Sequence, residues 1–273
     1  GRQFAHVVPL TGVLGWPVAH SRSPAMHEAA FAELGLAEWR YQRLPVPPAL
    51  FEETARALGG AGFAGANVTI PHKEAALAMA DEAGEEAAAI GAANTLTYTD
   101  GRIRADNTDA PGLLAAIGEP VESRSALVLG AGGSARAAVW ALLRAGARDV
   151  MVWNRTPARA EALCADLGGR PVIESEPADL LLNCTSVGLD ASDETFKELP
   201  ITADDVGDYC ALIDLVYTES ATTLARAATS NGVKTVDGLE ILVHQGALSL
   251  ERWTGRRAPI ETMRRAARRP SPR

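Results

Sequence analysis

Short apolar runs alternate with helix-like stretches through the first part of the chain. The runs at 12–14, 41–44 and 63–68 have the length and residue content of strands. Between them, the stretches 24–34 and 48–58 carry apolar residues at helical spacing. This order of strand, helix and strand predicts βαβ units.

Local signals mark the ends of these predicted elements. Ser23 and Pro24 supply an N-cap and a first-turn proline for the first helix, and Gly35 stands where a left-handed residue would end it. Further along, the segment 96–104 alternates around an Asp-Gly pair, which is the strongest two-residue hairpin signal. We therefore expect a β-hairpin at the end of a first lobe.

A second series of apolar runs follows, and its members are continuous rather than alternating. Continuous apolar strands predict a parallel sheet covered by helices on both faces. The runs lie at 126–129, 150–152, 180–182, 212–215 and 233–236. A helix over 239–253 comes next and can return to the first lobe, whereas 190–208 predicts a long surface loop. We expect an α/β protein of two αβ domains. Residues 1–108 form the first domain, residues 109–238 form the second, and the helices of 239–273 return to the first.

Composition agrees with an ordinary globular protein. Of 273 residues, 47% are hydrophobic and 22% are charged, and the formal net charge of -8 argues against nucleic acid and acidic membranes as partners. No apolar run reaches the roughly 18 residues of a membrane span, and no signal peptide is visible. Three cysteines without a C-x-x-C pair favour a reducing cytoplasm, and five histidines without H-E-x-x-H spacing predict no metal. We expect a monomer or a homodimer.

A glycine-rich turn joins the first strand of the second series to an alanine-rich helix. In that position the pattern G-x-G-x-x-A provides a tight turn, room for a pyrophosphate, and backbone N–H groups that face the anion. Its residues are Gly130, Ala131, Gly132, Gly133, Ser134 and Ala135. The turn predicts a dinucleotide site, and a purely structural glycine turn is the weaker alternative.

The end of the next strand indicates which dinucleotide is bound. NAD sites usually carry an acid here, which binds both ribose hydroxyls. This chain has Asn154 instead, followed by Arg155 and Thr156, with Arg159 one helical turn later. Two guanidinium groups suit a ribose 2′-phosphate, so NADP is favoured over NAD, although both arginines could be solvated surface charges.

Long segments of the chain resemble the shikimate dehydrogenase family. In the first lobe these are 15–27, 65–74, 91–95 and 106–109. In the second lobe and after it, the resemblance continues through 130–137, 154–156, 183–188, 214–217 and 237–245. It therefore covers nearly the whole chain, and it implies a substrate-binding lobe and an NADP-binding lobe with a cleft between them.

The resemblance also implies a role for each matching residue. It implies that Lys73 is the acid/base of catalysis and that Asp109 is its partner carboxylate. The substrate positions are Ser21, Ser23, Asn67, Thr69, Asn94, Tyr217 and Gln245. The cofactor positions are the glycine-rich turn, Asn154, Arg155, Thr156, Arg159, Thr185, Ser186, Leu215 and Gly238.

Each of these assignments has a structural alternative. Lys73 follows Pro71 in the predicted first turn of a helix that runs through Met79, where the positive dipole end disfavours the ammonium form. Without the surrounding motif, Lys73 would be interpreted as a solvated residue at a helix start. Asp109 suits an N-cap equally well, and both roles are compatible. Asn67 either contacts the substrate or braces its loop. His20 and His72 are expected to be structural or solvated rather than catalytic.

The expected activity is the reversible, NADPH-dependent reduction of 3-dehydroshikimate to shikimate in aromatic amino-acid biosynthesis. A dehydrogenase that also accepts quinate is the nearest alternative, because quinate differs by one ring hydroxyl. A non-catalytic NADPH-binding sensor is a second alternative, disfavoured because both Lys73 and Asp109 are retained. A folate-linked dehydrogenase is disfavoured by Ser21 and Ser23, since this pair suits a small carboxylate.

Overall fold

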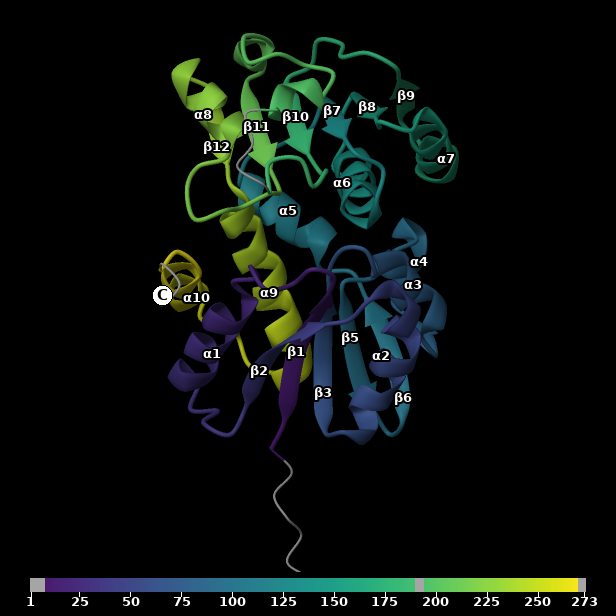
Figure 1. The fold of residues 1–273 in the computed structure, drawn as a ribbon, viewed down its shortest axis with the longest axis vertical. Coiled ribbons are helices and arrows are strands. Elements are labelled where there is room, and N and C mark those ends of the chain that lie inside the picture. Colours follow the sequence, from purple (N-terminus) through teal and green to yellow (C-terminus); the bar gives the residue numbers. More distant parts are fainter. Residues whose placement is uncertain (1–7, 190–193, 270–273) are drawn as a thin grey trace, which may run out of the picture. The chain divides into compact units, whose positions relative to one another are not determined.

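The computed structural model describes residues 8–189 and 194–269, which form two compact units. The first unit takes the described residues up to Thr108 together with Gly246–Arg269, and the second takes Asp109–Gln245 (Figure 1). Each unit contains one six-stranded sheet with helices packed on it. The predicted α/β class with two αβ units is confirmed.

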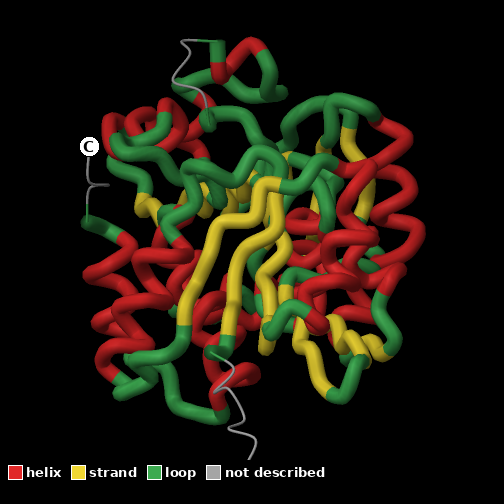
Figure 2. The backbone as a smooth tube through the Cα atoms, turned by 60° about the horizontal axis from the view of Figure 1, so that its bottom comes forward, coloured by secondary structure: helices red, strands yellow, loops and turns green. Residues whose placement is uncertain are grey.

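The sheet of the first unit combines parallel and antiparallel strands. Its order is β2-β1-β3-β5-β6-β4. β2, β1 and β3 are parallel, β5 is antiparallel to both β3 and β6, and β4 is parallel to β6. Figure 2 shows the strands of the protein in yellow. The strands are β1 (Leu10–Gly15), β2 (Arg40–Pro45), β3 (Phe63–Val68), β4 (Glu82–Ala83), β5 (Thr95–Thr99) and β6 (Arg102–Asp106). The predicted hairpin is confirmed, because Asp100 and Gly101 join β5 to β6 with φ of 51° and 75°, as a primed two-residue turn requires.

Two layers of helices cover the faces of this sheet. The helices are α1 (Ser23–Glu33), α2 (Phe51–Gly60) after the 3-10 turn η1 (Pro48–Leu50), α3 (Lys73–Met79), α4 (Glu85–Ile90), α10 (Ile260–Ala267) and the C-terminal part of α9 (Gly238–Thr254). Alternation along β3 separates the faces. Ala66 and Val68 join the apolar core beneath α2, whereas Gly65 and Asn67 meet Trp253 and Ser249 of α9. In Figure 1, α10 lies beside α1.

The start of α1 differs from the prediction by one residue. Ser23 is the first residue of the helix rather than its N-cap, and Arg22 takes the cap position without a capping side chain. The N–H groups of the first helical turn have no acceptor within the helix. The Ser21 hydroxyl oxygen accepts a 3.3 Å hydrogen bond from one of them, the Ser23 N–H, which allows the helix to begin at Ser23. The predicted end is correct, since Gly35 has φ of 70°.

The sheet of the second unit is fully parallel, with the order β12-β11-β10-β7-β8-β9. This is the doubly wound order of dinucleotide-binding folds. The strands are β7 (Ser125–Leu129), β8 (Asp149–Trp153), β9 (Arg170–Val172), β10 (Leu180–Asn183), β11 (Ala211–Asp214) and β12 (Lys234–Val236). The five predicted strands are confirmed, and the edge strand β9 is additional.

Helices cover both faces of the second sheet, as continuous apolar strands require. They are α5 (Asp109–Ile117), α6 (Gly133–Arg144), α7 (Pro157–Leu167), α8 (Thr223–Ser230) and the first part of α9. Val128 of β7 faces one apolar core and its neighbours Leu127 and Leu129 face the other. The predicted loop 190–208 contains the 3-10 turns η2 (Thr195–Lys197) and η3 (Asp205–Asp208), while 190–193 lies outside the described residues.

Within the described ranges, no helix is both long and apolar enough to cross a lipid bilayer.

Candidate functional site

The loop that enters α1 presents two buried serines. The Arg43 guanidinium donates two hydrogen bonds, of 3.1 and 2.8 Å, to the Ser21 carbonyl oxygen, which holds the loop against β2. Ser23 is a buried residue with 3% of its surface exposed, and its hydroxyl makes no hydrogen bond with another described residue. A hydroxyl group without an intramolecular partner can donate to an incoming acceptor such as a carboxylate.

Lys73 is a buried lysine at the first position of α3. Only 9% of its surface is exposed, and its carbonyl oxygen accepts the Ala93 N–H at 2.9 Å. Its neighbour His72 has a structural role: the ring stacks on Phe51 with centroids 4.4 Å apart, and Nε2 lies 2.8 Å from the Val46 carbonyl oxygen. Burial lowers the pKa of His72, against the opposing effect of that backbone contact. Lysine is rarely this buried unless it is paired or functional.

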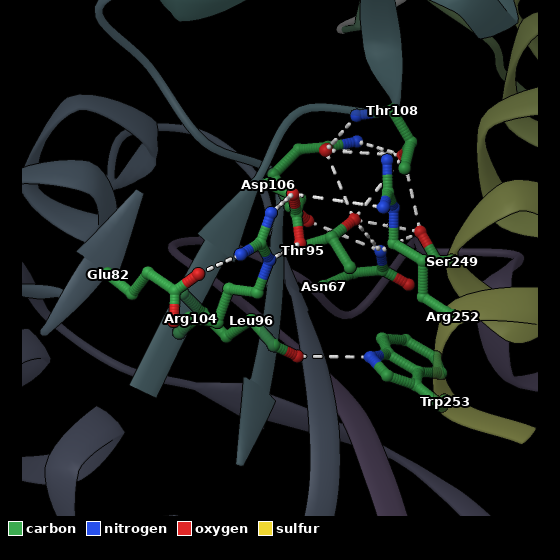
Figure 3. A network of polar contacts seen from close by, with 11 residues as sticks. Asn67, Glu82, Thr95, Leu96, Arg104, Asp106, Thr108, Ser249, Arg252 and Trp253 are labelled. Atoms are coloured by element: carbon green, nitrogen blue, oxygen red, sulfur yellow. Dashed lines mark hydrogen bonds and ion pairs between the residues drawn. The ribbon is translucent and has the colours of Figure 1, made fainter. Parts of the chain in front are cut away.

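Asn67, labelled in Figure 3, and Asn94 belong to one buried polar network. The Asn67 amide accepts a hydrogen bond from the Tyr41 hydroxyl at 2.8 Å and donates to the Asn94 carbonyl oxygen, Thr95 Oγ1 and Ser249 Oγ, at 3.2, 3.3 and 2.9 Å. Both ends of this amide are therefore engaged within the first unit, which favours the bracing interpretation of Asn67.

Asn94 is oriented by the residue that precedes Asp109. Its Oδ1 accepts the Thr108 N–H at 2.7 Å, and its Nδ2 donates to Thr108 Oγ1 at 2.8 Å. The backbone N–H can only donate, so the first contact identifies the oxygen end of the amide and the two together fix its plane. Ser249 of α9 completes the network, with its Oγ 2.8 Å from Thr95 Oγ1 and 3.2 Å from Thr108 Oγ1.

A second polar cluster lies beside this network (Figure 3). The buried Asp106 carboxylate accepts a hydrogen bond of 3.1 Å from Arg104 Nε and lies 3.8 Å from Arg252 Nη1 of α9. Arg104 also pairs with Glu82 of β4. The Trp253 indole N–H donates to the Leu96 carbonyl oxygen at 3.0 Å. Neighbouring residues of α9 are thus tied to β5 and β6 by polar contacts.

Three candidate residues belong to the second unit. Asp109 is the first residue of α5, Tyr217 lies half-buried after β11, and Gln245 of α9 donates from Nε2 to the Leu242 carbonyl oxygen at 2.8 Å. Close helix packing positions Gln245, because a Cβ added at Gly112 of α5 would lie 2.8 Å from its Cβ. Lys73 and Asp109 fall in different units, so their pairing stays a prediction.

Most of the predicted cofactor residues surround one pocket of about 220 Å³. Its lining comes from the ends of β7, β8 and β10 and from the segment after η2. The lining residues are Gly130, Ala131, Gly132, Trp153, Asn154, Arg155, Thr156, Arg159, Cys184, Thr185, Ser186, Val187 and Glu198. Gly133, Ser134 and Ala135 begin α6 directly behind it. Leu215 and Gly238 do not line this pocket but touch each other, since a Cβ at Gly238 would meet the Leu215 oxygen at 2.5 Å.

The glycine-rich turn has the geometry that an anion needs. Gly130 has φ of 110°, and its N–H donates to the Trp153 carbonyl oxygen at 2.7 Å. A Cβ at this position would come within 3.0 Å of the Cys184 oxygen, whereas one at Gly132 would meet nothing within 4 Å. The open space before α6 suits a diphosphate, which the N–H groups and dipole of a helix start attract.

A hydrogen-bonded loop forms the wall of the pocket that follows β10. Asn183 Oδ1 accepts the Thr185 hydroxyl at 2.7 Å, and Asn183 Nδ2 donates to Asp214 Oδ1 at 3.0 Å. Burial raises the pKa of the Asp214 carboxyl, while hydrogen bonds from Thr222, Asn183 and the Val216 N–H act in the opposite direction. Asn183 and Asp214 lie in motifs of the family resemblance, but we did not predict them as site residues.

The ribose end of the pocket carries the predicted cations. Asn154 Nδ2 donates to the Thr156 carbonyl oxygen at 2.9 Å, which shapes the turn. Arg155 and Arg159 are exposed, and Arg159 makes no ion pair with any described residue. Arg155 Nη1 lies 3.7 Å from Glu198 Oε2. Glu198 is a pocket residue that sequence reasoning missed, because it lies in a loop without a motif. The set fits a dinucleotide with a 2′-phosphate near Arg155.

The described parts of the chain contain no cluster of three or more histidine, cysteine or acidic side chains arranged to hold a metal ion.

Three family models match the chain. Residues 13–96 match the shikimate dehydrogenase substrate binding domain, 113–186 match shikimate / quinate 5-dehydrogenase, and 238–268 match the shikimate 5'-dehydrogenase C-terminal domain. Among curated proteins, shikimate dehydrogenase (NADP(+)) of Paracoccus denitrificans is 42% identical over 94% of this chain and 95% of its own length. The protein of that name from Methylobacterium radiotolerans is 46% identical over 92% and 93%.

Solved structures of the same enzyme are also similar. Shikimate 5-dehydrogenase from Thermus thermophilus, in complex with NADP(H) and shikimate, is 43% identical with a TM-score of 0.85, covering 95% of this chain and 98% of that one. Shikimate dehydrogenase from Aquifex aeolicus is 32% identical with a TM-score of 0.89, covering 97% and 99%.

Proposed function

Since this chain belongs to the shikimate dehydrogenase family, we propose that its first unit binds the substrate, that its second unit binds NADPH, and that Lys73 and Asp109 perform the acid–base chemistry. The protein is an NADP-dependent oxidoreductase that interconverts 3-dehydroshikimate and shikimate in aromatic amino-acid biosynthesis. The observation that carries the catalytic assignment is the burial of Lys73 at the start of α3, where its carbonyl oxygen accepts the N–H of Ala93, the neighbour of Asn94.

Reduction of a ring ketone adds a hydride to carbon and a proton to oxygen. NADPH, when bound, supplies the hydride. The Lys73 ammonium donates its proton from Nζ to the carbonyl oxygen as negative charge develops there, and it takes the proton back in the reverse reaction. The Asp109 carboxylate accepts hydrogen bonds from the reacting hydroxyl and from the lysine, which keeps both in line.

Hydroxyl and amide groups hold the rest of the substrate. Ser21, Ser23, Thr69 and Tyr217 donate to the carboxylate, and Asn94 and Gln245 bind the ring hydroxyls. The Ser23 hydroxyl, which makes no hydrogen bond with another described residue, supports this assignment. Asn67 acts through Asn94 and Ser249 rather than by contact with the substrate, as its hydrogen bonds indicate.

The cofactor is held by the second unit. The diphosphate binds at Gly130, Gly132 and the start of α6. The 2′-phosphate binds Arg155 and Arg159 through charge-assisted contacts. Thr185 and Ser186 form the wall of the pocket that follows β10. Leu215 and Gly238, which touch each other, mark where the cofactor continues beyond the pocket.

A reducing cytoplasm is the location we propose, because the described cysteines Cys164, Cys184 and Cys210 form no disulfide. The proposed assembly is a monomer or a homodimer. Sedimentation of the purified protein distinguishes the two, and a larger complex would contradict both.

Absorbance of NADPH in the presence of 3-dehydroshikimate tests the proposed function. We expect turnover with 3-dehydroshikimate, and in the reverse direction turnover of NADP with shikimate well above that with quinate. Binding of NADPH without turnover would identify a sensor, and equal use of shikimate and quinate would identify a dual-specificity enzyme.

A further inference from the structure

The nucleotide pocket contains one acidic side chain opposite its cations. Among the described residues that line it, Glu198 alone carries negative charge, whereas Arg155 and Arg159 carry positive charge. Glu198 Oε2 lies 3.7 Å from Arg155 Nη1, with 46% of the Glu198 side chain and 82% of the Arg155 side chain exposed. The pair therefore lies at the mouth of the pocket, where a ribose 2′-phosphate would meet Arg155.

The backbone around Glu198 is anchored, so the carboxylate has a defined place. Thr195 of η2 is buried, and Leu199, the next residue, belongs to the apolar core that Leu212 of β11 also joins. The Glu198 N–H donates to the Thr195 carbonyl oxygen at 3.3 Å. Buried residues on both sides thus hold Glu198 at the pocket while its own side chain stays exposed.

A carboxylate in this place acts differently on the two nicotinamide cofactors. A 2′-phosphate carries a charge of about -1.5 to -2 and is attracted to the guanidinium whose Nη1 lies 3.7 Å from Glu198 Oε2. The carboxylate therefore competes with the phosphate for the same positive charge and repels it. A 2′-hydroxyl makes no such demand. It can donate to a carboxylate, as ribose hydroxyls do in sites that select NAD.

We propose that Glu198 is a specificity-determining residue of the nucleotide site, which competes with the 2′-phosphate for Arg155 and so lowers the preference for NADPH over NADH. The proposal rests on the proposed role of Arg155 in binding that phosphate. It assigns a role to the residue that follows η2, a position for which the sequence shows no motif.

Binding measured by calorimetry with 2′,5′-ADP and 5′-AMP tests Glu198 without catalysis. In Glu198→Gln the carboxylate is lost and the shape is kept. We expect 2′,5′-ADP to bind about 1.5- to 5-fold more tightly, the range expected for one exposed ion pair, and 5′-AMP to bind equally or more weakly. Glu194→Gln is the matched control: Glu194 pairs with Lys197 at 2.6 Å, does not line the pocket, and should leave both affinities unchanged.

The same substitution in an Arg155→Ala background shows whether Glu198 acts through Arg155. We expect the gain in affinity for 2′,5′-ADP to be smaller in this background, because the Arg155 guanidinium for which Glu198 competes is absent. An equal gain in both backgrounds, a parallel change for both nucleotides, or weaker binding of 2′,5′-ADP in Glu198→Gln would overturn the proposal. Weaker binding would mean that Glu198 positions Arg155 for the phosphate.

Failure of the cofactor assignment has a separate signature. If Arg155→Ala leaves the affinity for 2′,5′-ADP unchanged, the role of Arg155 under the proposed function is wrong. If Arg155→Ala does weaken the binding of 2′,5′-ADP, Glu198→Gln decides the present proposal: tighter binding of 2′,5′-ADP supports it, and an unchanged affinity overturns it.

Discussion

Asn67 Nδ2 donates a 2.9 Å hydrogen bond to Ser249 Oγ, although 182 residues separate the two in the chain. β3 carries Asn67, and the part of α9 that belongs to the first unit carries Ser249. Thr95 and Thr108 also contact the Ser249 hydroxyl. The returning helix is thus bonded to the residues that orient Asn94, which makes α9 part of the support of the proposed substrate site.

Ser249→Ala should lower the free energy of unfolding by about 1 to 3 kcal/mol, because it leaves buried polar groups without a partner. Urea denaturation measures the change. Ser230→Ala, at the exposed end of α8, is the control and should stay within about 0.5 kcal/mol. If Ser249→Ala is as neutral as the control, the network does not stabilise the fold.

Lys73→Ala should lower kcat about 100-fold or more and change KM much less, since proton donation helps mainly in the transition state. Asp109→Asn should also slow turnover, because the amide keeps the shape without the charge. Steady-state kinetics on folded variants, checked by circular dichroism, measures both. Near-normal turnover of Lys73→Ala would remove it from the mechanism, and an Asp109→Asn variant that loses only thermal stability would support the helix-capping alternative.

Ser23→Ala should mainly raise KM, because a carboxylate remote from the reacting carbon is bound equally in the ground state and the transition state. One charge-assisted hydrogen bond contributes about 1.5 to 3 kcal/mol, which corresponds to roughly 10- to 150-fold. Initial rates over a range of shikimate concentrations measure the split. A large loss of kcat at constant KM would contradict the proposal that Ser23 binds the substrate carboxylate.

Arg155→Ala should weaken the use of NADPH by roughly 10- to 150-fold in kcat/KM, the equivalent of one charge-assisted contact, and leave NADH nearly unaffected. Kinetics with both cofactors tests this. Arg159→Ala should give a smaller loss of the same kind. Equal losses for NADH and NADPH would mean that Arg155 is structural, and a wild-type preference for NADH would contradict the cofactor itself.

His27 should make the protein less stable in acid. Its ring is fully buried, stacks on Tyr41 with centroids 4.3 Å apart, and has no hydrogen-bond partner among the described residues. Burial lowers its pKa from 6.5 to about 3. The unfolded chain therefore binds the extra proton between these values, and stability, complete above pH 6.5, falls by up to about 1.4 kcal/mol per pH unit as the pH drops toward 3.

Urea denaturation of His27→Phe and the wild type between pH 4 and 7 measures this effect. The variant keeps an aromatic ring beside Tyr41, and its stability should depend less on pH. Parallel profiles of the two proteins would show that His27 does not cause the acid dependence.

Several elements were predictable because their signals are local. The Asp100-Gly101 turn needs two residues that tolerate positive φ, and the turn at Gly130 needs one; sequence shows both directly. The buried strands of the second unit show as continuous apolar runs. β4 and β9, of two and three residues, are too short for any period to appear.

The sequence by itself determined the chemistry available to this protein: a family, a glycine turn for a diphosphate, and a lysine and an aspartate within long motifs. Only the tertiary structure decided which side chains meet. It engaged the Asn67 amide with Ser249, placed Glu198 against Arg155, and buried His27 among aromatic rings. The first two pairings join residues far apart in the chain, and His27 meets Tyr41 where α1 packs against β2. Contacts of these kinds leave no periodicity or local signal, because they exist only after the sheet and its helices have packed.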